Sequence, residues 1–273
     1  MGAEITRVVS DVHYGDRATR VRSLAQLSPL FDGASAFILN GDTLDTRPGP
    51  PPEHAREEMR KVREFFARAP CPVTFLSGNH DADFTTLHSL DLAKGRVFAT
   101  HGDILFDDIV PWGRDAKSIR VQLKAALAAI SIGRDPGMDE RLLALRAVAA
   151  SIPQRHQSER RPLQYALRFA ADTVWPPHRA VFVLRAWREM PARAAAFLRR
   201  YRPDARFILI GHTHRPGVWR TRSGVVVINT GTFCPPFSPY AVDISPDRLT
   251  VRRIEARSGE FHFSTNVAKF TLP

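Results

Sequence analysis

The stretch FILIGHTHRP, residues 207–216, is the part of the sequence that decides the fold. Four apolar residues typical of a buried strand end at Gly211, and His212 and His214 follow within three positions. Two imidazoles placed this close together indicate that something binds them. Their partners must be sought elsewhere in the chain.

The same arrangement occurs at four other places. In each, a short β-rich run ends, usually near a glycine, and polar side chains follow it. The runs and the residues after them are 5–10 with Asp11 and His13, 36–39 with Asn40 and Asp42, 72–76 with Asn79 and His80, and 96–100 with His101 and Asp103. The sequence therefore predicts an α/β fold in which five strands deliver Asp, Asn or His at their carboxyl ends.

These polar side chains are expected to form one site, because loops after separate strands converge outside the carboxyl edge of an α/β sheet. Oxygen and nitrogen donors without cysteine suit divalent ions such as Mn2+, Mg2+, Fe2+ or Zn2+. Two such ions about 3.5–4 Å apart could hold the attacking and leaving oxygens of an in-line displacement at phosphorus. Each motif alone is weak evidence, since an isolated Asp or His usually belongs to a turn. Their combination at five strand ends is specific.

The combined motifs also resemble a known family. They are Asp11-Val12-His13, Gly41-Asp42-Thr43-Leu44-Asp45, Gly78-Asn79-His80-Asp81, His101 and Gly211-His212-Thr213-His214. Together they are similar to the five-block signature of the calcineurin-like metallophosphoesterases, over residues 11–214. The resemblance implies a four-layer α/β/β/α sandwich of two mixed sheets.

The resemblance further implies a dinuclear metal centre, with Mn2+ as the first choice of ion. The implied ligands are Asp11, His13 and His214 for the first ion, Asn79, His101 and His212 for the second, and Asp42 as the bridge. A bridge must be a carboxylate, because two cations sharing one ligand need a negative charge on two donor oxygens. The implied reaction is hydrolysis of a phosphodiester, phosphomonoester or pyrophosphate by in-line attack of a hydroxide that bridges the ions.

By the same resemblance, His80 protonates the leaving oxygen and Asp45 orients its ring. The alternatives are a hydrogen-bonded loop residue for His80 and a turn or helix cap for Asp45. Arg47 and Asp108 are candidate substrate contacts, although an exposed loop arginine is the simpler interpretation of Arg47. In the Ser/Thr protein-phosphatase branch, arginine directly follows the last aspartate of the second block, whereas Thr46 intervenes here. This departure argues against a protein phosphatase.

The positive charge of the chain lies in one segment. Residues 114–202 hold 18 Lys or Arg and 7 Asp or Glu, a surplus of 11 that equals the formal charge of the whole chain. Apolar residues recur at helical spacing at Ile119, Leu123 and Leu127, and a further helix is expected through Leu163 and Val174. We therefore divide the chain into a discontinuous core, residues 1–113 and 203–273, and a basic helical insert, residues 114–202.

The insert has a similar position to that in the UDP-2,3-diacylglucosamine pyrophosphohydrolases, in which inserted helices form a lid over acyl chains. That similarity implies a nucleotide- or lipid-linked pyrophosphate such as UDP-diacylglucosamine as substrate. Those enzymes carry arginine where this chain has His80, so contacts to the leaving group are expected to differ. Helices with apolar and basic faces also suit an anionic membrane surface, or simply pack on the core with a solvated outer face. The same charge would attract nucleic acid.

The composition is ordinary for a soluble enzyme, with 44% hydrophobic and 25% charged residues. The first residues lack the pattern of a secretory leader, and no run of about 18 apolar residues occurs. We therefore expect a cytoplasmic hydrolase of phosphoric esters or pyrophosphates, with peripheral contact to the inner face of the membrane. Cys71 and Cys234 are too few for a disulfide framework or a thiolate metal site. A nuclease and a non-catalytic scaffold on the same fold are the alternatives, and the oligomeric state is left open.

Overall fold

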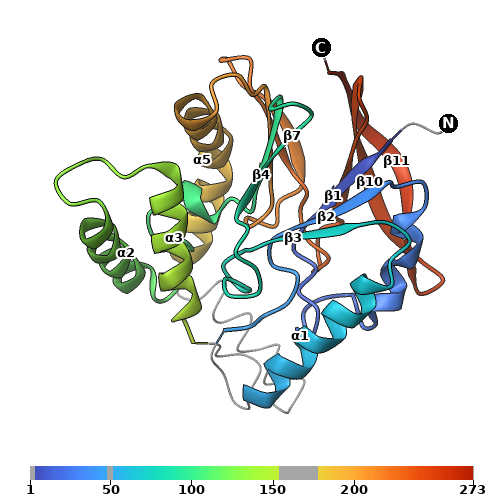
Figure 1. Ribbon diagram of the computed structural model, residues 1–273, viewed down its shortest axis with the longest axis horizontal. Coiled ribbons are helices and arrows are strands. Elements are labelled where there is room, and N and C mark those ends of the chain that lie inside the picture. The colour runs from blue at the N-terminus through green and yellow to red at the C-terminus, as the bar shows by residue number, and fades with distance from the viewer. Residues whose placement is uncertain (1–3, 48–51, 154–177, 273) are drawn as a thin grey trace.

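The computed structural model describes residues 4–47, 52–153 and 178–272. Two β-sheets pack face to face between two layers of helices (Figure 1). The expected helix through Leu163 and Val174 lies outside the described residues.

The first sheet has six strands in the order β11-β10-β9-β1-β2-β3. Their bounds are β1 Thr6–Val9, β2 Ala36–Asn40, β3 Val73–Leu76, β9 Tyr240–Ile244, β10 Arg248–Arg257 and β11 Glu260–Thr271. The three N-terminal strands are parallel to one another, and β9, β10 and β11 continue the sheet antiparallel, so the sheet is mixed.

The second sheet has five strands in the order β4-β5-β6-β8-β7. Their bounds are β4 Ser89–Leu92, β5 Val97–Thr100, β6 Phe207–Ile210, β7 Gly217–Arg220 and β8 Val226–Asn229. The central strands β5, β6 and β8 are parallel, and the two edge strands are antiparallel to them. All five strands expected from the sequence are therefore present, as β1, β2, β3, β5 and β6.

Strand β6 illustrates how the layers form. Successive side chains of a strand point to opposite faces. Phe207 and Leu209 pack between the two sheets, against Val8 and Ile38 of the first sheet. Ile208 and Ile210 point the other way and pack against helices. Both faces of the second sheet are thus covered, which explains why this strand is apolar throughout.

Helices cover the outer face of each sheet and complete the expected α/β/β/α sandwich. The 3-10 helix η1, Leu24–Phe31, and α1, Pro52–Ala67, pack on the first sheet. Helices α2, Ala116–Ile130, α3, Met138–Ala150, and α5, His178–Tyr201, lie on the side of the second sheet (Figure 1). A short 3-10 helix, η2, Asp103–Leu105, follows β5.

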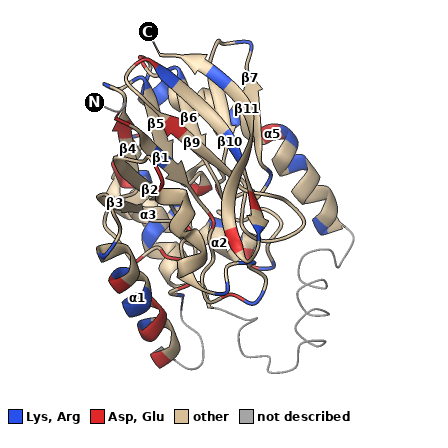
Figure 2. Ribbon diagram, turned by 90° about the vertical axis from the view of Figure 1, so that its right-hand side faces the viewer, with Lys and Arg blue, Asp and Glu red and all other residues tan. Residues whose placement is uncertain are grey.

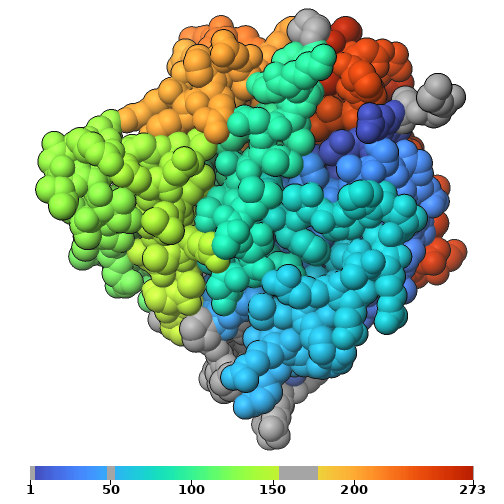
Figure 3. Space-filling model, in the orientation of Figure 1, coloured from blue at the N-terminus to red at the C-terminus, as the bar shows by residue number. Residues whose placement is uncertain are grey.

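The described part of the insert shares its apolar core with the second sheet. Ala194 and Leu198 of α5 belong to the same buried cluster as Ile208 of β6, and Leu145 of α3 and Leu123 of α2 join that cluster. Figure 3 shows α2 and α3 forming one flank of the molecule. These helices therefore serve as the outer layer of the sandwich, while the domain boundaries at residues 114 and 202 and the function of a lid stay predictions.

Charged residues on the described helices are partly paired. Figure 2 shows both signs of charge along α1 and a run of basic residues on α5. On α5, Glu189 lies 2.7 Å from Arg185 and 2.9 Å from Arg193. Among the described helices, none combines the length and the apolar character needed to cross a bilayer.

Candidate metal centre

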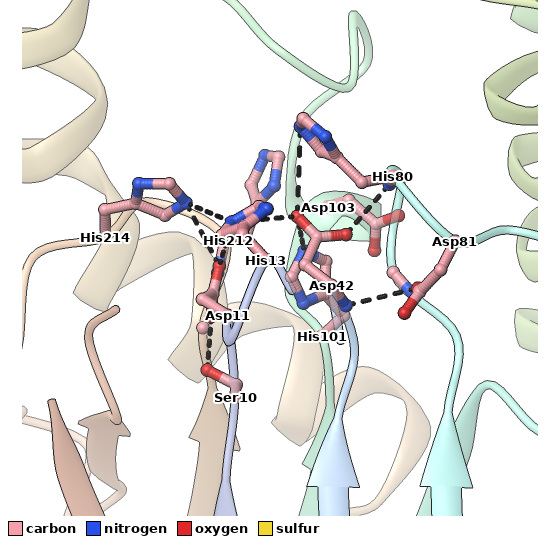
Figure 4. Close-up of polar contacts among 12 residues, drawn as sticks. Ser10, Asp11, His13, Asp42, His80, Asp81, His101, Asp103, His212 and His214 are labelled. Carbon is pink, nitrogen blue, oxygen red and sulfur yellow. Dashed lines mark hydrogen bonds and ion pairs between the residues drawn. The ribbon is translucent and has the colours of Figure 1, made fainter. Parts of the chain in front are cut away.

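The polar residues predicted from the sequence meet at the carboxyl edges of both sheets (Figure 4). The side chains come from the loops after five strands, with Asp11 and His13 after β1, Asp42 after β2, Asn79 and His80 after β3, His101 after β5, and His212 and His214 after β6. Backbone pairing continues beyond the strand ends, since Asp11 N donates to Gly41 O at 3.1 Å and Gly211 N to His101 O at 2.8 Å. The loops are thereby held next to one another.

Four of these residues form one compact group of donors. Asp11, His13, Asp42 and His214 each offer a ligand atom, and these atoms lie within 4.8 Å of one another. Nε2 of His214 lies 3.2 Å from Oδ1 of Asp11 and 3.0 Å from Nε2 of His13. A spacing of this kind suits a divalent cation bound by carboxylate oxygen and imidazole nitrogen.

A second group of donors lies on the other side of Asp42. Nε2 of His101 is 3.2 Å from Oδ2 of Asp42, and the same oxygen is 3.8 Å from Nε2 of His13. Among the described residues, the buried Oδ1 of Asn79 has no hydrogen-bond partner, and the buried Nε2 of His101 has only the Asp42 carboxylate beside it. Buried polar atoms normally have a partner, so the Asn79 oxygen, together with the His101 nitrogen beside Asp42, fits a second cation.

His212 is oriented by the backbone of the segment after η2. Its Nε2 lies 2.8 Å from the carbonyl oxygen of Ile109, which fixes the ring and leaves Nδ1 for another ligand. Its ring centroid is 5.2 Å from that of His101. Metal-binding histidines are commonly held in this way through their second nitrogen.

Most of the predicted ligands have a strained backbone. A positive φ occurs at Asp11 (52°), His13 (49°), Asp42 (51°), His212 (62°) and His214 (57°). Residues other than glycine rarely adopt a positive φ. Such backbone strain tends to occur at functional sites, where the surrounding structure enforces it. The backbone therefore turns sharply at these residues to direct their side chains into one volume.

Two glycines of the motifs permit the close approach of the loops. A Cβ added at Gly78 would lie 2.5 Å from the backbone nitrogen of Asp42 and closer still to its carboxylate. A Cβ at Gly211 would collide with the Asp11 carboxylate and the Ser10 hydroxyl. Neither loop could approach its neighbour if it carried a side chain at this position.

Burial and charge give the two kinds of histidine different protonation. Burial lowers the pKa of His13 to about 4 and that of His212 to about 3, so both imidazoles are neutral at pH 7 and can donate a lone pair. Burial also opposes the charged form of His101, but the Asp42 carboxylate raises the pKa of His101 well above its usual value. A cation at Asp42 would take the place of that proton.

His80 belongs to a hydrogen-bonded chain beside this group. Its Nδ1 lies 3.1 Å from Oδ2 of Asp45, and Arg47 donates to both carboxylate oxygens of Asp45, at 2.9 and 2.6 Å. Burial and Arg47 oppose protonation, yet Asp42 and Asp45 raise the pKa of His80. Nε2 of His80 lies 4.0 Å from Oδ2 of Asp42, so the ring faces the centre of the site without belonging to the four-residue group.

The sequence was compared with models of protein families. The model described as calcineurin-like phosphoesterase matches residues 6–216. The chain belongs to the calcineurin-like phosphoesterase family. Its centre of Asp and His residues is thus one that could hold the divalent ions of a metallophosphoesterase. A search of curated proteins found no match.

Solved structures are similar to this chain at low identity. Vacuolar protein sorting 29 of Cryptosporidium parvum is 12% identical, with 100% of each chain covered and a TM-score of 0.47. A dimetal phosphatase of Danio rerio is 13% identical, with 96% of this chain and 99% of that one covered and a TM-score of 0.46. A mutant cold-active protein tyrosine phosphatase is 16% identical, with 96% and 80% covered and a TM-score of 0.41.

The two candidate substrate contacts both have intramolecular partners. The Arg47 side chain is 14% exposed and pairs with Asp45, so Arg47 is not an exposed loop arginine. Asp108 pairs with Arg120 of α2 at 2.6 Å. Through these ion pairs, Arg47 holds Asp45 in place, and Asp108 joins the segment after η2 to helix α2. Their contact with substrate stays a prediction.

Asp81 is a structural residue of the site to which the sequence analysis gave no role. Its buried carboxylate accepts backbone hydrogen bonds from Asp42 N at 3.1 Å, Thr43 N at 2.7 Å and Gly78 N at 2.6 Å. Burial and the charge of Asp42 raise the pKa of Asp81 to about 7. Asp81 thereby joins the loops after β2 and β3. Its place directly after Asn79-His80 was the only signal for it in the sequence.

Proposed function

We propose that this phosphoesterase is a metal-dependent hydrolase that cleaves a phosphodiester, phosphomonoester or pyrophosphate bond. The observation that carries the proposal is the position of Asp42, whose Oδ2 lies 3.8 Å from His13 on one side and 3.2 Å from His101 on the other. A carboxylate between two sets of nitrogen and oxygen donors is the arrangement that two cations sharing one ligand require.

The proposed ligands are the seven named from the sequence, with Mn2+ as the first ion to test and Mg2+, Fe2+ and Zn2+ as alternatives. Asp11, His13, Asp42 and His214 would hold one ion, and Asn79, His101 and His212 together with Asp42 would hold the other. When bound, two divalent ions supply an activated water and neutralise the charge that develops on the phosphoryl oxygens. The protein supplies the orientation of these donors, which the strained backbone and the loop-to-loop hydrogen bonds fix before substrate binds.

His80 is the proposed proton donor to the leaving oxygen. The raised pKa of His80 favours the protonated ring near neutral pH, and its Asp45 partner fixes Nδ1 so that Nε2 points towards the site. Arg47 keeps Asp45 ionised and immobile through its paired hydrogen bonds. A donor oriented in this way contributes about 10²–10⁴ to the rate when the leaving group is a poor one.

Asp42→Asn tests this proposal most directly, because the amide has the same size as the carboxylate but lacks the charge and one acceptor oxygen. We expect metal content after dialysis to fall and hydrolysis of bis(p-nitrophenyl) phosphate in Mn2+ to fall by more than about 100-fold. Asp91→Asn, at an exposed residue of β4, is the matched control and should retain both. Full activity of Asp42→Asn would refute the dinuclear centre.

A panel of substrates separates the remaining alternatives. Phosphomonoesters, phosphodiesters and pyrophosphates, including a UDP-linked glycolipid such as UDP-diacylglucosamine, test the reaction class, and single-stranded and double-stranded nucleic acids test a nuclease. Turnover of the nucleic acids alone would favour the nuclease. If the wild type binds the ions but turns over none of these substrates, a non-catalytic scaffold would be favoured.

The basic insert supports a second part of the proposal, peripheral contact with an anionic membrane on the cytoplasmic side. On α5, Val181 and Leu184 are 61% and 60% exposed, and Arg188 lies on the same helix. Each basic residue near an anionic surface adds roughly 1 kcal/mol, which is screened by salt. We expect co-sedimentation with phosphatidylserine vesicles at low salt and release at high salt. Equal binding to neutral vesicles, or none, would overturn this part.

A further inference from the structure

An arginine directly after the last metal-centre histidine lies close to two tryptophan rings. Cζ of Arg215 is 5.6 Å from the ring centroid of Trp187 and 5.8 Å from that of Trp219. Both distances are within the range of cation–π attraction, which is strongest for tryptophan. Trp187 comes from α5 in the insert and Trp219 from β7 of the core, so the two rings come from distant parts of the chain.

This arrangement is built into the metal-centre loop. Nε1 of Trp187 donates a hydrogen bond of 2.8 Å to the carbonyl oxygen of Thr213, between the two histidines. The ring of Phe237 packs edge-on against Trp187, with centroids 5.7 Å apart. On the other side, a Cβ at Gly217 would lie 2.6 Å from Cζ2 of Trp219, so only glycine allows that ring to fold back over the chain.

No carboxylate within the described part of the chain neutralises the charge of Arg215. Among the described residues, Arg215 has neither a carboxylate partner nor a hydrogen bond, and its side chain is half-buried. In contrast, Arg47 beside His80 and Arg120 of α2 each pair with an aspartate. Ring faces attract a guanidinium but accept none of its five N–H groups, so these donors are still available to an anion.

We propose that Arg215 binds a second anionic group of the substrate, a phosphate next to the one that is attacked. This inference rests on the proposed function and adds the substrate class, namely esters of diphosphate. His214, whose side chain is 37% exposed, immediately precedes Arg215. Trp187, which lies 5.6 Å from the guanidinium, also donates to Thr213 O between the two histidines, so Arg215 and the metal-centre loop share this tryptophan. Arginine can bind phosphate through two parallel hydrogen bonds, and Trp187 and Trp219 hold the guanidinium in place before binding.

The proposal is tested first by binding, without turnover. Methylenediphosphonate and methylphosphonate are titrated into the protein at a fixed free concentration of Mn2+, with tryptophan fluorescence as the signal because Arg215 lies against two indoles. We expect the diphosphonate to bind at least about tenfold more tightly than the monophosphonate, the effect of one charge-assisted hydrogen bond or more. Arg215→Ala should abolish this preference, and Arg215→Lys should restore only part of it, since lysine lacks the planar pair of donors.

A matched control and a kinetic measurement complete the test. Arg222→Ala removes the same charge from the exposed turn between β7 and β8 and should leave the preference intact. In turnover, Arg215→Ala should raise KM for a diphosphate ester at least about tenfold while kcat/KM for bis(p-nitrophenyl) phosphate changes less than twofold. If Arg215 had a purely structural role, the substitution would lower kcat/KM for both substrates alike.

The two proposals fail in different ways. The role of Arg215 is refuted if Arg215→Ala binds both phosphonates with the affinities of the wild type. It is also refuted if the substitution weakens the binding of both phosphonates by the same factor, even when hydrolysis is intact. If the wild type hydrolyses nothing yet prefers the diphosphonate through Arg215, the proposed reaction is refuted and the anion site is upheld.

Discussion

Replacing Gly78 by alanine tests how closely the loops of the metal centre must approach. The new Cβ would lie 2.5 Å from the backbone nitrogen of Asp42, whereas ordinary contact begins near 3.4 Å. The loop after β3 must therefore retreat from the loop after β2 by about 1 Å, a strain that typically costs about 1–3 kcal/mol. Since no positive φ is recorded at Gly78, this effect comes from the contact and not from the backbone conformation.

Moving the loop after β3 would affect the geometry of the metal centre more than the stability of the fold. Asn79 follows Gly78 directly, and Gly78 N donates to Asp81, the residue that ties the two loops together. Misplacing a reacting group by about 1 Å can cost about 100-fold in rate. We therefore expect Gly78→Ala to lose at least about 100-fold in kcat/KM with Mn2+, while the protein stays folded and melts a few degrees lower.

The measurements are the metal content after dialysis, the rate with bis(p-nitrophenyl) phosphate, and the melting temperature. Gly137→Ala is the control, because this glycine has a negative φ of −66° and, of the described residues, only Glu140 comes within 4 Å of the added Cβ, with its Oε2 at 3.7 Å. If Gly78→Ala binds metal and turns over as the control does, the close approach of the two loops is not needed, and the reasoning is refuted.

Three further predictions concern the residues around the ligands. His80→Gln should retain bound metal and lower kcat by about 10²–10⁴ for alkyl phosphate diesters, but by less than tenfold for p-nitrophenyl esters, whose leaving group needs no proton; loss of metal would make His80 a ligand. Burial alone would raise the pKa of Asp45, but Arg47 and His80 lower this pKa below its ordinary value. The ionised carboxylate therefore stabilises the fold above its unfolded pKa of about 3.9, and this contribution is lost as the pH falls through the folded pKa. The difference in melting temperature between wild type and Asp45→Asn should thus be largest near pH 6 and shrink towards pH 3; a constant difference would contradict it. Asp81→Ala leaves three buried N–H groups without an acceptor and should cost more than about 3 kcal/mol in urea unfolding, against less than about 0.5 kcal/mol for the exposed Asp107→Ala.

The sequence predicted the strands and the residues at their ends because both are local properties. A run such as Phe207–Ile210 is apolar at every position because both of its faces are buried, and the glycine and histidines after it mark the end of the strand. The order of such motifs along the chain was specific enough to indicate the family and the two mixed sheets. Asp11, His13, Asp42 and His214, named from the sequence, do form one group of donors.

Only the tertiary structure decided which side chains meet when no local pattern joins them. Arg47 pairs with Asp45 instead of extending into solvent, and helix α5 packs on the second sheet and places Trp187 against Thr213, 26 residues further along the chain. The positive φ at Asp42 is likewise enforced by its surroundings, since aspartate does not prefer that conformation. A sequence records the preferences of each segment, whereas a contact between segments depends on how every layer packs against the next. The strands and the metal-ligand candidates at their ends could therefore be predicted from the sequence, whereas the partners of Arg47, Asp81 and Arg215 could not.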